Sequence, residues 1–218
     1  MKILDVPRSG SYQGLTSSRN RNGQYVRTRA TPVNPNTTFQ AGVRSRLASN
    51  AAAWRTLTEV EQAGWASLGL LMTRTDALGQ TYNLTGFQAY VAVNNNLAAA
   101  GDSALTAAPA LTTPDAIASA TVTLTGAAFS IAYTPTPLGT GERLFTFASP
   151  QRSAGRSFEN DYRLIAVSAA AAASPANVFS AYQTRMGTPV VGNKVFMALH
   201  RYSGGFLSAP LLKASIVA

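Results

Sequence analysis

The sequence predicts an α+β protein built from an extended basic N-terminal arm, a small three-helix region and an antiparallel β-sandwich. Nine of its 18 Lys and Arg residues lie in the first 57 positions, beside a single acidic residue. Three helix-start signals follow between residues 37 and 88. Short β-type runs then alternate with turn residues to the end. We expect the arm at 1–36, the helices at 37–101, a linker at 102–118 and the sandwich at 119–218.

The arm is rich in Ser, Asn, Arg, Gly and Pro and shows no sustained periodicity. We therefore expect it to have no fold of its own. Only residues 24–31 (QYVRTRAT) alternate as a short strand would. Fully extended, the arm reaches about 110 Å at roughly 3.3 Å per residue. We expect it to become ordered on a neighbouring chain.

The three helices are predicted by one repeated signal, the capping box. In this motif a Thr side chain accepts from an early backbone N–H, and a Glu or Gln three residues later reaches back to the Thr backbone. The pattern occurs as Thr37 with Gln40, Thr58 with Glu61, and Thr85 with Gln88. The third helix is expected from Gly86 to about Ala99, with Gly101 ending it.

Apolar side chains recur on one face of each predicted helix. They are Phe39, Val43, Leu47 and Trp54 in the first, Val60, Gly64, Trp65 and Leu68 in the second, and Phe87, Tyr90, Val91 and Leu97 in the third. The short connection between the first two predicts an antiparallel helical hairpin. Residues 73–86 are expected to form a connector that can include a short strand.

The C-terminal part has seven strand-like runs at the spacing of a sandwich. They are Thr121–Thr125, Phe129–Tyr133, Leu144–Ala148, Tyr162–Val167, Val178–Tyr182, Val195–Tyr202 and Leu212–Val217. Turns such as PTPLGTGE and VVGNK separate them. Seven strands in a hundred residues is the size of an immunoglobulin or fibronectin-like module.

Few residues are available for catalysis or metal binding. The chain has no cysteine, one histidine (His200) and nine scattered carboxylates. No Gly-x-Ser-x-Gly elbow accompanies the histidine, and the pairs Glu59/Glu61 and Glu159/Asp161 lack a third ligand in sequence. We therefore predict no enzymatic activity and no catalytic, cofactor-binding or metal site.

Membrane partners are not expected either. No apolar stretch approaches 18 residues. The start, MKILDVPRSG, has too short an apolar run for a signal-peptide core. We expect a soluble product without an export signal.

The arginines of the arm are typical of two kinds of surface. Arginines interleaved with an aromatic residue occur in nucleic-acid-binding tails. Arginine with tyrosine is also enriched at protein interfaces, where lysine is depleted. The dispersed spacing and near absence of lysine favour the protein interface. We predict that it includes Arg19, Arg21, Tyr25, Arg27 and Arg29 of the arm and Arg44 and Arg46 of the first helix.

One long stretch is similar to uncharacterised virion structural proteins encoded by tailed bacteriophages and prophages. The shared residues are SRNRNGQYVRTRATPVNPNT, then Gln40, Val43, Arg44, Leu47, Trp54, Leu-Thr at 57–58 and Trp65, and the segment LGQTYNLTGFQAYVAVNNNLAAAG. The resemblance covers about residues 10–101 and extends more weakly to SPQRSAGRSFENDYR. Gly64 departs from it, since a helix-favouring residue is expected there.

The resemblance implies a structural, non-enzymatic component of a phage particle. We expect a head-associated decoration, cement or minor capsid protein, assembled in the host cytoplasm, that forms homo-oligomers and contacts major capsid or tail subunits through its arm. A tail-associated or host-binding role is the alternative, and would place Phe158, Tyr162 or Phe206 at exposed loop tips. A nucleic-acid-binding role of the basic arm is the third.

Overall fold

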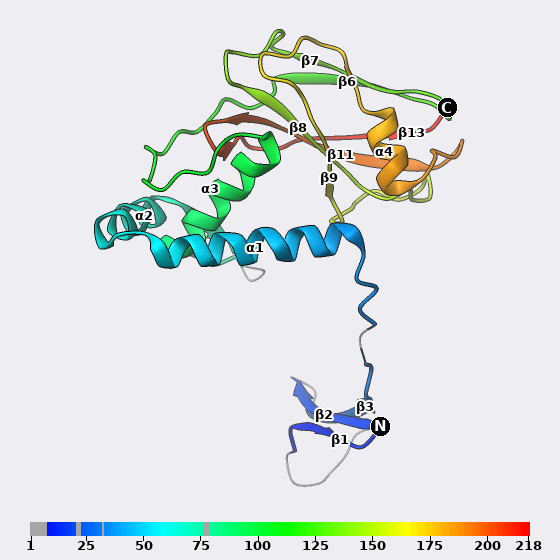
Figure 1. Ribbon diagram of the computed structural model, residues 1–218. Helices are drawn as coiled ribbons and strands as arrows, with labels where there is room; N and C mark the ends of the chain where they lie inside the picture. The colour runs from blue at the N-terminus through cyan, green and yellow to red at the C-terminus, as the bar shows by residue number, and fades with distance from the viewer. Residues whose placement is uncertain (1–7, 21–22, 32, 76–78) are drawn as a thin grey trace. The chain divides into compact units, whose positions relative to one another are not determined.

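The computed structural model describes residues 8–20, 23–31, 33–75 and 79–218. The chain divides into two compact units, Met1–Arg44 and Ser45–Ala218. Helices and antiparallel sheets occur together, which confirms the predicted α+β class (Figure 1).

The first unit contains a three-stranded antiparallel sheet, which we call the N-terminal sheet. Its strands are β1 (Gly10–Tyr12), β2 (Leu15–Asn20) and β3 (Gly23–Thr28), in the order β1-β2-β3. The expectation that the arm has no fold of its own is therefore wrong for these residues. A two-residue turn at Gln13 and Gly14 lets the chain pair with itself, and the Arg29 N–H donates to the Gly14 carbonyl at 2.8 Å. The sequence did not predict this pairing, because the residues of the Ser-rich strand β2 do not alternate between apolar and polar.

The helices begin where the capping boxes predict. They are α1 (Thr38–Thr56), α2 (Glu59–Leu71) and α3 (Gly86–Ala100). In each, the threonine hydroxyl accepts from the backbone N–H three residues on, and the Gln or Glu side chain accepts from the threonine N–H. Gly101 ends α3 with a φ of 79°, a left-handed conformation that suits glycine.

The second helix packs mainly against the third. A hydrogen bond to the first, from the Gln62 side chain to the Trp54 carbonyl, lies near the connection, and the predicted antiparallel hairpin of α1 and α2 is therefore wrong. The backbones of α2 and α3 approach closely because a glycine stands at each point of contact, Gly69 in α2 and Gly86 in α3. A Cβ on Gly69 would lie 2.5 Å from the Leu84 carbonyl oxygen, and one on Gly86 would lie 2.9 Å from the Ala66 nitrogen. Between the two helices, β4 (Thr73–Thr75) and β5 (Thr81–Asn83) form a short antiparallel hairpin, which confirms the strand expected in this connector.

The predicted inward faces of the helices are correct in part. The residues Trp65, Leu68, Tyr90 and Leu97 are buried as expected, whereas Phe87 and Val91 are half-buried. Val60 is 82% exposed, because it lies in the first turn of α2 at the exposed end of the helix. Phe39, Val43 and Leu47 on α1 are each roughly half exposed, and the apolar stripe of α1 is partly buried only near Trp54.

The C-terminal strands form two antiparallel sheets. The first consists of β6 (Ser119–Leu124), β7 (Phe129–Thr134) and β10 (Ala176–Asn177), in the order β10-β7-β6. The second consists of β8 (Arg143–Ala148), β9 (Arg163–Val167), β11 (Lys194–Ser203), β12 (Phe206–Leu207) and β13 (Leu211–Ile216). Its order is β12-β11-β8-β9, and β13 also pairs with β11.

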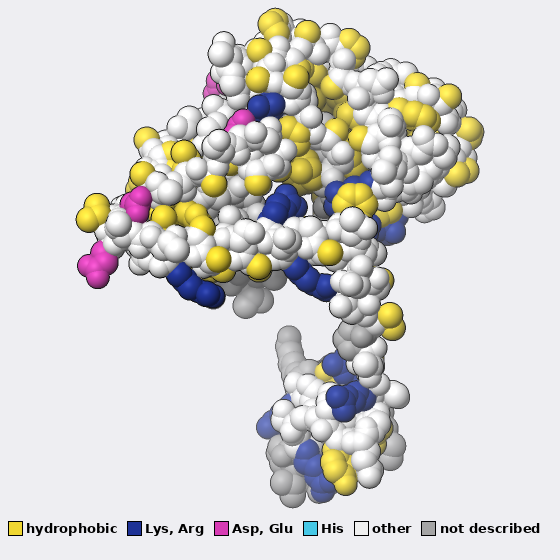
Figure 2. Space-filling model, viewed as in Figure 1, with side chains coloured by type: hydrophobic (Ala, Val, Ile, Leu, Met, Phe, Trp, Pro, Cys, Tyr) yellow, Lys and Arg dark blue, Asp and Glu magenta, His cyan; other side chains and the backbone are white. Residues whose placement is uncertain are grey.

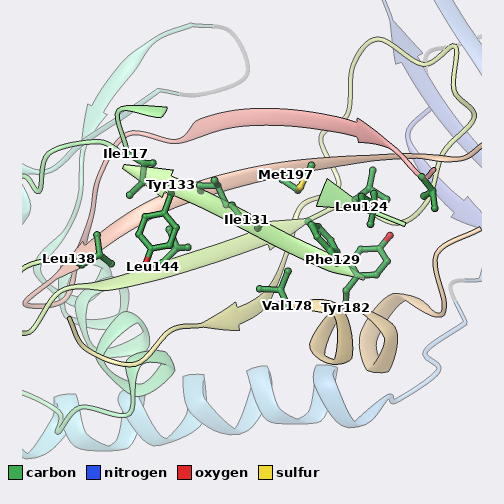
Figure 3. Packing of buried hydrophobic residues seen from close by; sticks show 14 residues of the cluster. Ile117, Leu124, Phe129, Ile131, Tyr133, Leu138, Leu144, Val178, Tyr182 and Met197 are labelled. Atoms are coloured by element: carbon green, nitrogen blue, oxygen red, sulfur yellow. The ribbon is translucent and has the colours of Figure 1, made fainter. Parts of the chain in front are cut away.

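Side chains from both sheets meet in one hydrophobic cluster (Figure 3). Phe129 and Ile131 of β7 lie in it with Leu144 of β8 and Met197 of β11, all nearly inaccessible to solvent. The alternation of buried and exposed positions along β6 and β7 explains why these strands could be predicted from sequence.

One predicted strand, Val178–Tyr182, is wrong, because this stretch begins α4 (Phe179–Met186). The Asn177 side chain accepts from the Phe179 N–H at 3.1 Å, which favours a helical start. Phe179, Tyr182 and Met186 recur at helical spacing and pack on the core. The Tyr182 ring lies edge-on to Phe129 at 5.3 Å.

The helices α2 and α3 share a second hydrophobic cluster with the larger sheet. It joins Trp65, Tyr90 and Leu97 to Phe145, Tyr202 and Phe206. The helices α2 and α3 and the C-terminal strands thus belong to one compact unit, whereas the sequence predicts a helical region and a separate β domain.

Residues 102–118, expected to be a linker, are held by specific contacts. The Trp65 indole N–H donates to the Thr106 carbonyl at 2.6 Å, and the Asn94 side chain bonds both backbone groups of Leu105. The Asp102 carboxylate accepts from the Tyr202 hydroxyl at 2.6 Å and from Arg143 at 3.0 Å. The Tyr202 hydrogen bond, followed by Arg143, lowers the pKa of Asp102. This segment therefore connects the helices to the larger sheet.

Candidate interaction surfaces and a polar cavity

The N-terminal sheet has one apolar face. Tyr12 pairs with Leu15, and Ser17, on the same side of β2 as Leu15, pairs with Val26. Since alternate residues of a strand share a face, Tyr12, Leu15 and Val26 lie together. No residue of β1 or β3 is buried, and Tyr12 and Leu15 are 77% and 54% exposed. We call Tyr12, Leu15 and Val26 the apolar face of the N-terminal sheet.

This face forms a hollow of about 420 Å³ whose rim is polar and basic. Arg8 and Gln24 line the hollow, and the Arg8 N–H donates to the Gln24 side chain at 3.0 Å. Arg19 lies on the same side of β2, opposite Gln24. Figure 2 shows the mixture of dark blue and yellow side chains on the N-terminal sheet. The surface therefore combines apolar area with positive charge.

The structure brings only some of the predicted interface residues together. Tyr25 and Arg27 lie on the face of β3 opposite the apolar one, whereas Arg19 lies on the apolar side. Arg29 follows β3 and is exposed. Arg21 lies outside the described residues. The apolar residues Tyr12 and Leu15 were missed because the Gln-Gly pair between them is not one of the dipeptides, such as Asn-Gly or Asp-Gly, that indicate a two-residue hairpin.

The two predicted interface residues of α1 belong to different units. Arg44 bonds the side-chain oxygens of Asn34 and Asn36, at 3.0 and 3.1 Å, in the segment that leads into the helix. Arg46 is exposed on the part of α1 that belongs to the second unit. Arg44 thus stabilises the segment that precedes α1.

The carboxylate pair Glu159 and Asp161 is bound by arginines. The Glu159 side chain is only 3% exposed and accepts hydrogen bonds from Arg152 and from the Asn160 and Asp161 N–H groups. Asp161 makes two bonds to Arg163, at 2.9 and 3.1 Å. The hydrogen bond from the Asp161 N–H, then that from Arg152, lowers the pKa of Glu159 from 4.5 to about 2. Within the described ranges, no group of three or more His, Cys, Asp or Glu residues is placed to hold a metal ion.

Replacing Glu159 with glutamine should reduce the acid sensitivity of the fold. Because the folded-state pKa is lowered, the ionised carboxylate stabilises the native state above pH 4.5, and this contribution is lost as the pH falls towards 2. Urea denaturation of both proteins across this range should show a smaller loss of stability for Glu159→Gln, which is less stable at pH 7. Parallel losses of stability with acid in the two proteins would contradict this role.

His200, on β11, is held by a main-chain contact. Its Nδ1 lies 2.7 Å from the Ser208 carbonyl oxygen, which can only accept, so Nδ1 carries the proton and Nε2 is left as an acceptor. Burial lowers the pKa of His200. The Ser208 hydroxyl accepts from the Arg201 N–H and donates to the Ala209 carbonyl. His200 and Ser208 are therefore not arranged as a catalytic base and nucleophile.

A cavity of about 620 Å³ lies beside His200. It is bounded by α3, β4 and the segments 111–113 and 205–210. Its polar lining includes Arg74, Asn95, Asn96, Thr112 and Thr113 together with His200. These residues lie far apart in sequence.

No family model matches this sequence. No curated protein and no solved structure matches it either. The part of the chain that the structure describes also contains no helix long and apolar enough to cross a membrane.

The three aromatic residues expected at loop tips lie in different environments. Phe158 is 67% exposed, Tyr162 is half-buried and Phe206 is 6% exposed. Phe158 and Tyr162 line a shallow hollow of about 320 Å³ with Leu212 of β13. Only Phe158 has the exposure that a host-binding loop tip requires.

Proposed function

We propose that this chain is a non-enzymatic structural subunit of a tailed-phage particle, with a head-associated role as a decoration, cement or minor capsid protein. The observation that carries the proposal is the apolar face of the N-terminal sheet. Tyr12 and Leu15 are exposed on this three-stranded sheet, and burying such apolar side chains against another surface is favourable in water. A neighbouring protein in a particle would cover this face. The resemblance of residues 10–101 to virion structural proteins supports the same role.

The proposal extends to the fold of the C-terminal strands as a sandwich of immunoglobulin or fibronectin type. Its support is the connectivity. The hairpin β6-β7 lies in one sheet and β8-β9 in the other, β10 returns to pair with β7, and β11 returns to pair with β8. Such alternation between two antiparallel sheets is typical of these modules, which are used widely as surface and assembly domains.

The charge distribution favours a different protein, and not a second copy of this chain, as the partner of the N-terminal sheet. Residues 1–44 contain seven Lys and Arg residues and one acidic residue. Four of the seven described carboxylates of the second unit, Asp102, Glu142, Glu159 and Asp161, are paired at close range with arginines of their own chain. A second copy therefore offers mainly Glu59, Glu61 and Asp115 as negative surface. We infer that the N-terminal sheet docks on an acidic surface of another virion protein, such as the major capsid or a tail subunit.

The test is incorporation of a double variant, Tyr12→Ser with Leu15→Ser, into particles. The variant should be present at a copy number reduced by about tenfold, because aromatic and aliphatic anchors carry most of the binding energy of an interface. Mass spectrometry of purified particles measures the copy number. The matched control is Tyr25→Ser with Arg27→Ser, on the opposite face of the same sheet, which should be incorporated normally.

Normal incorporation of the Tyr12/Leu15 variant, or equal loss with the control, would contradict docking through the apolar face. Titration with duplex DNA separates the nucleic-acid alternative. Binding that weakens steeply with salt, as phosphate contacts require, and that the Tyr12/Leu15 variant retains would indicate that the basic residues serve the genome and would contradict the proposal.

A further inference from the structure

The cavity beside His200 has the size and lining of a small-molecule site. Its volume of about 620 Å³ falls within the range of ligand pockets. Ala92 of α3 and Phe206 and Leu207 of β12 supply an apolar side, whereas the other walls carry amides, hydroxyls, an imidazole and a guanidinium. All of these residues belong to the unit Ser45–Ala218.

The polar groups of the cavity keep hydrogen-bonding capacity after their internal bonds are made. Asn95 accepts from Asn50 through its side-chain oxygen, so its amide N–H groups remain for a ligand. Asn96 donates to the Gly205 carbonyl at 2.8 Å, which leaves its oxygen as an acceptor. The protonated Nδ1 of His200 leaves Nε2 as a further acceptor. Adjacent donors and acceptors of this kind match hydroxyl groups, which both donate and accept.

The cavity also carries the positive charge of Arg74, which no described residue neutralises. Arg74 lines it, and within residues 8–20, 23–31, 33–75 and 79–218 this guanidinium has no hydrogen-bond or ion-pair partner. None of the described residues that line the cavity is a carboxylate. A ligand carboxylate would therefore meet the planar, two-pronged donor that suits it, with no competing anion.

The geometry points to a binding site for a carboxylated sugar, a uronic acid or a sugar acid of similar size. The guanidinium of Arg74 binds the carboxylate. Asn95, Asn96 and His200 bond the ring hydroxyls, and the C–H face of the ring lies on Ala92, Phe206 and Leu207. This assignment stands independently of the docking role of the N-terminal sheet.

A phosphate is a poorer match for the same cavity. The lining residues of α3 lie in the middle and C-terminal half of the helix, far from the positive N-terminal end that binds phosphates. Among the described residues that line the cavity, only Arg74 is an arginine, and its charge balances a singly charged carboxylate but not a doubly charged phosphate. The acceptors Asn96 Oδ1 and His200 Nε2 would also face the oxygens of inorganic phosphate, which are mainly acceptors themselves.

The test is to titrate the full chain separately with glucuronate, glucose and inorganic phosphate. Binding is measured from changes in amide chemical shifts in nuclear magnetic resonance spectra. Glucuronate should shift resonances of the cavity residues and bind more tightly than glucose, and phosphate should bind most weakly. Arg74→Ala should weaken glucuronate binding by about tenfold, the loss of one charged pair, and leave glucose binding unchanged. The matched control is Arg55→Ala, which removes the same charge from an exposed site on α1 that does not line the cavity.

A second variant tests the position of the carboxylate without removing a side chain. Asn95→Asp keeps nearly the same shape but places a negative charge beside the ligand, and should reject glucuronate while retaining glucose. The proposal fails if glucuronate does not bind at about 10 mM, an affinity near the weak limit of specific binding. It also fails if Arg55→Ala weakens binding as much as Arg74→Ala, or if phosphate binds as well as glucuronate.

Discussion

Replacing Trp65 with alanine should lower the free energy of unfolding of the second unit by about 3 to 5 kcal/mol, the usual cost of truncating a large buried aromatic residue. Trp65 is completely buried, and its ring lies edge-on to Tyr90 at 5.2 Å. The substitution would leave a cavity where α2, α3 and the larger sheet meet. It would also leave the Thr106 carbonyl without the indole N–H that donates to it.

Urea denaturation followed by far-ultraviolet circular dichroism measures this effect without relying on tryptophan fluorescence. The control is Trp54→Ala, which truncates the other tryptophan of the chain. Trp54 is half-buried, with its ring 5.8 Å from Phe87 and 5.4 Å from Tyr90, so its loss should cost less. If Trp54→Ala proves the more destabilising, Trp65 does not hold the two layers together as described.

Two glycines of α2 should respond in opposite directions to the same substitution. Gly69→Ala should destabilise the protein by about 1 to 3 kcal/mol, the range for overpacking, because its Cβ would lie 2.5 Å from the Leu84 carbonyl oxygen. That oxygen belongs to the backbone before α3, so relief requires α2 and α3 to separate. Gly64→Ala should stabilise by about 1 kcal/mol through helix propensity, since its Cβ would make an ordinary contact with Ala108 at 3.7 Å.

Thermal denaturation of the two variants and of the parent protein measures the effect of each substitution on stability. The change in midpoint temperature should be negative for Gly69→Ala and positive for Gly64→Ala. A change of the same sign in both would mean that the approach of α2 to α3 is not set by Gly69. Gly64 is also the position where the phage-protein resemblance predicts a better helix former, and the space beside it accommodates one.

Features decided by neighbouring residues in the chain could be predicted well. The three capping boxes were predicted because the donor and acceptor lie within three residues of each other, so no tertiary contact is needed to form them. Strands β7, β8 and β11 were recognised because their apolar residues face a buried core. By contrast, Val178–Tyr182 was misassigned because its β-branched and aromatic residues satisfy strand propensity, while helical packing of Tyr182 on Phe129 decides the outcome.

The candidate surfaces were harder to predict, because each depends on residues brought together by pairing or packing. The arginines of the arm were visible as charge, but the face on which each lies depends on the register of β2 with β3. The residues that bound the cavity come from five segments, and only His200 and Phe206 among them were singled out as candidate functional residues from sequence. Arg74 and Asn95 had no pattern that would distinguish them from solvent-exposed polar residues.

The sequence by itself determined the α+β class, the starts of α1, α2 and α3, and the concentration of positive charge near the N-terminus. These follow from local hydrogen bonding, from the spacing of apolar residues and from composition. Only the tertiary structure decided that α2 packs on α3, that residues 102–118 join the helices to the larger sheet, and that Tyr12, Leu15 and Val26 share a face. Contacts between distant residues depend on backbone approach and strand register, which propensities do not encode.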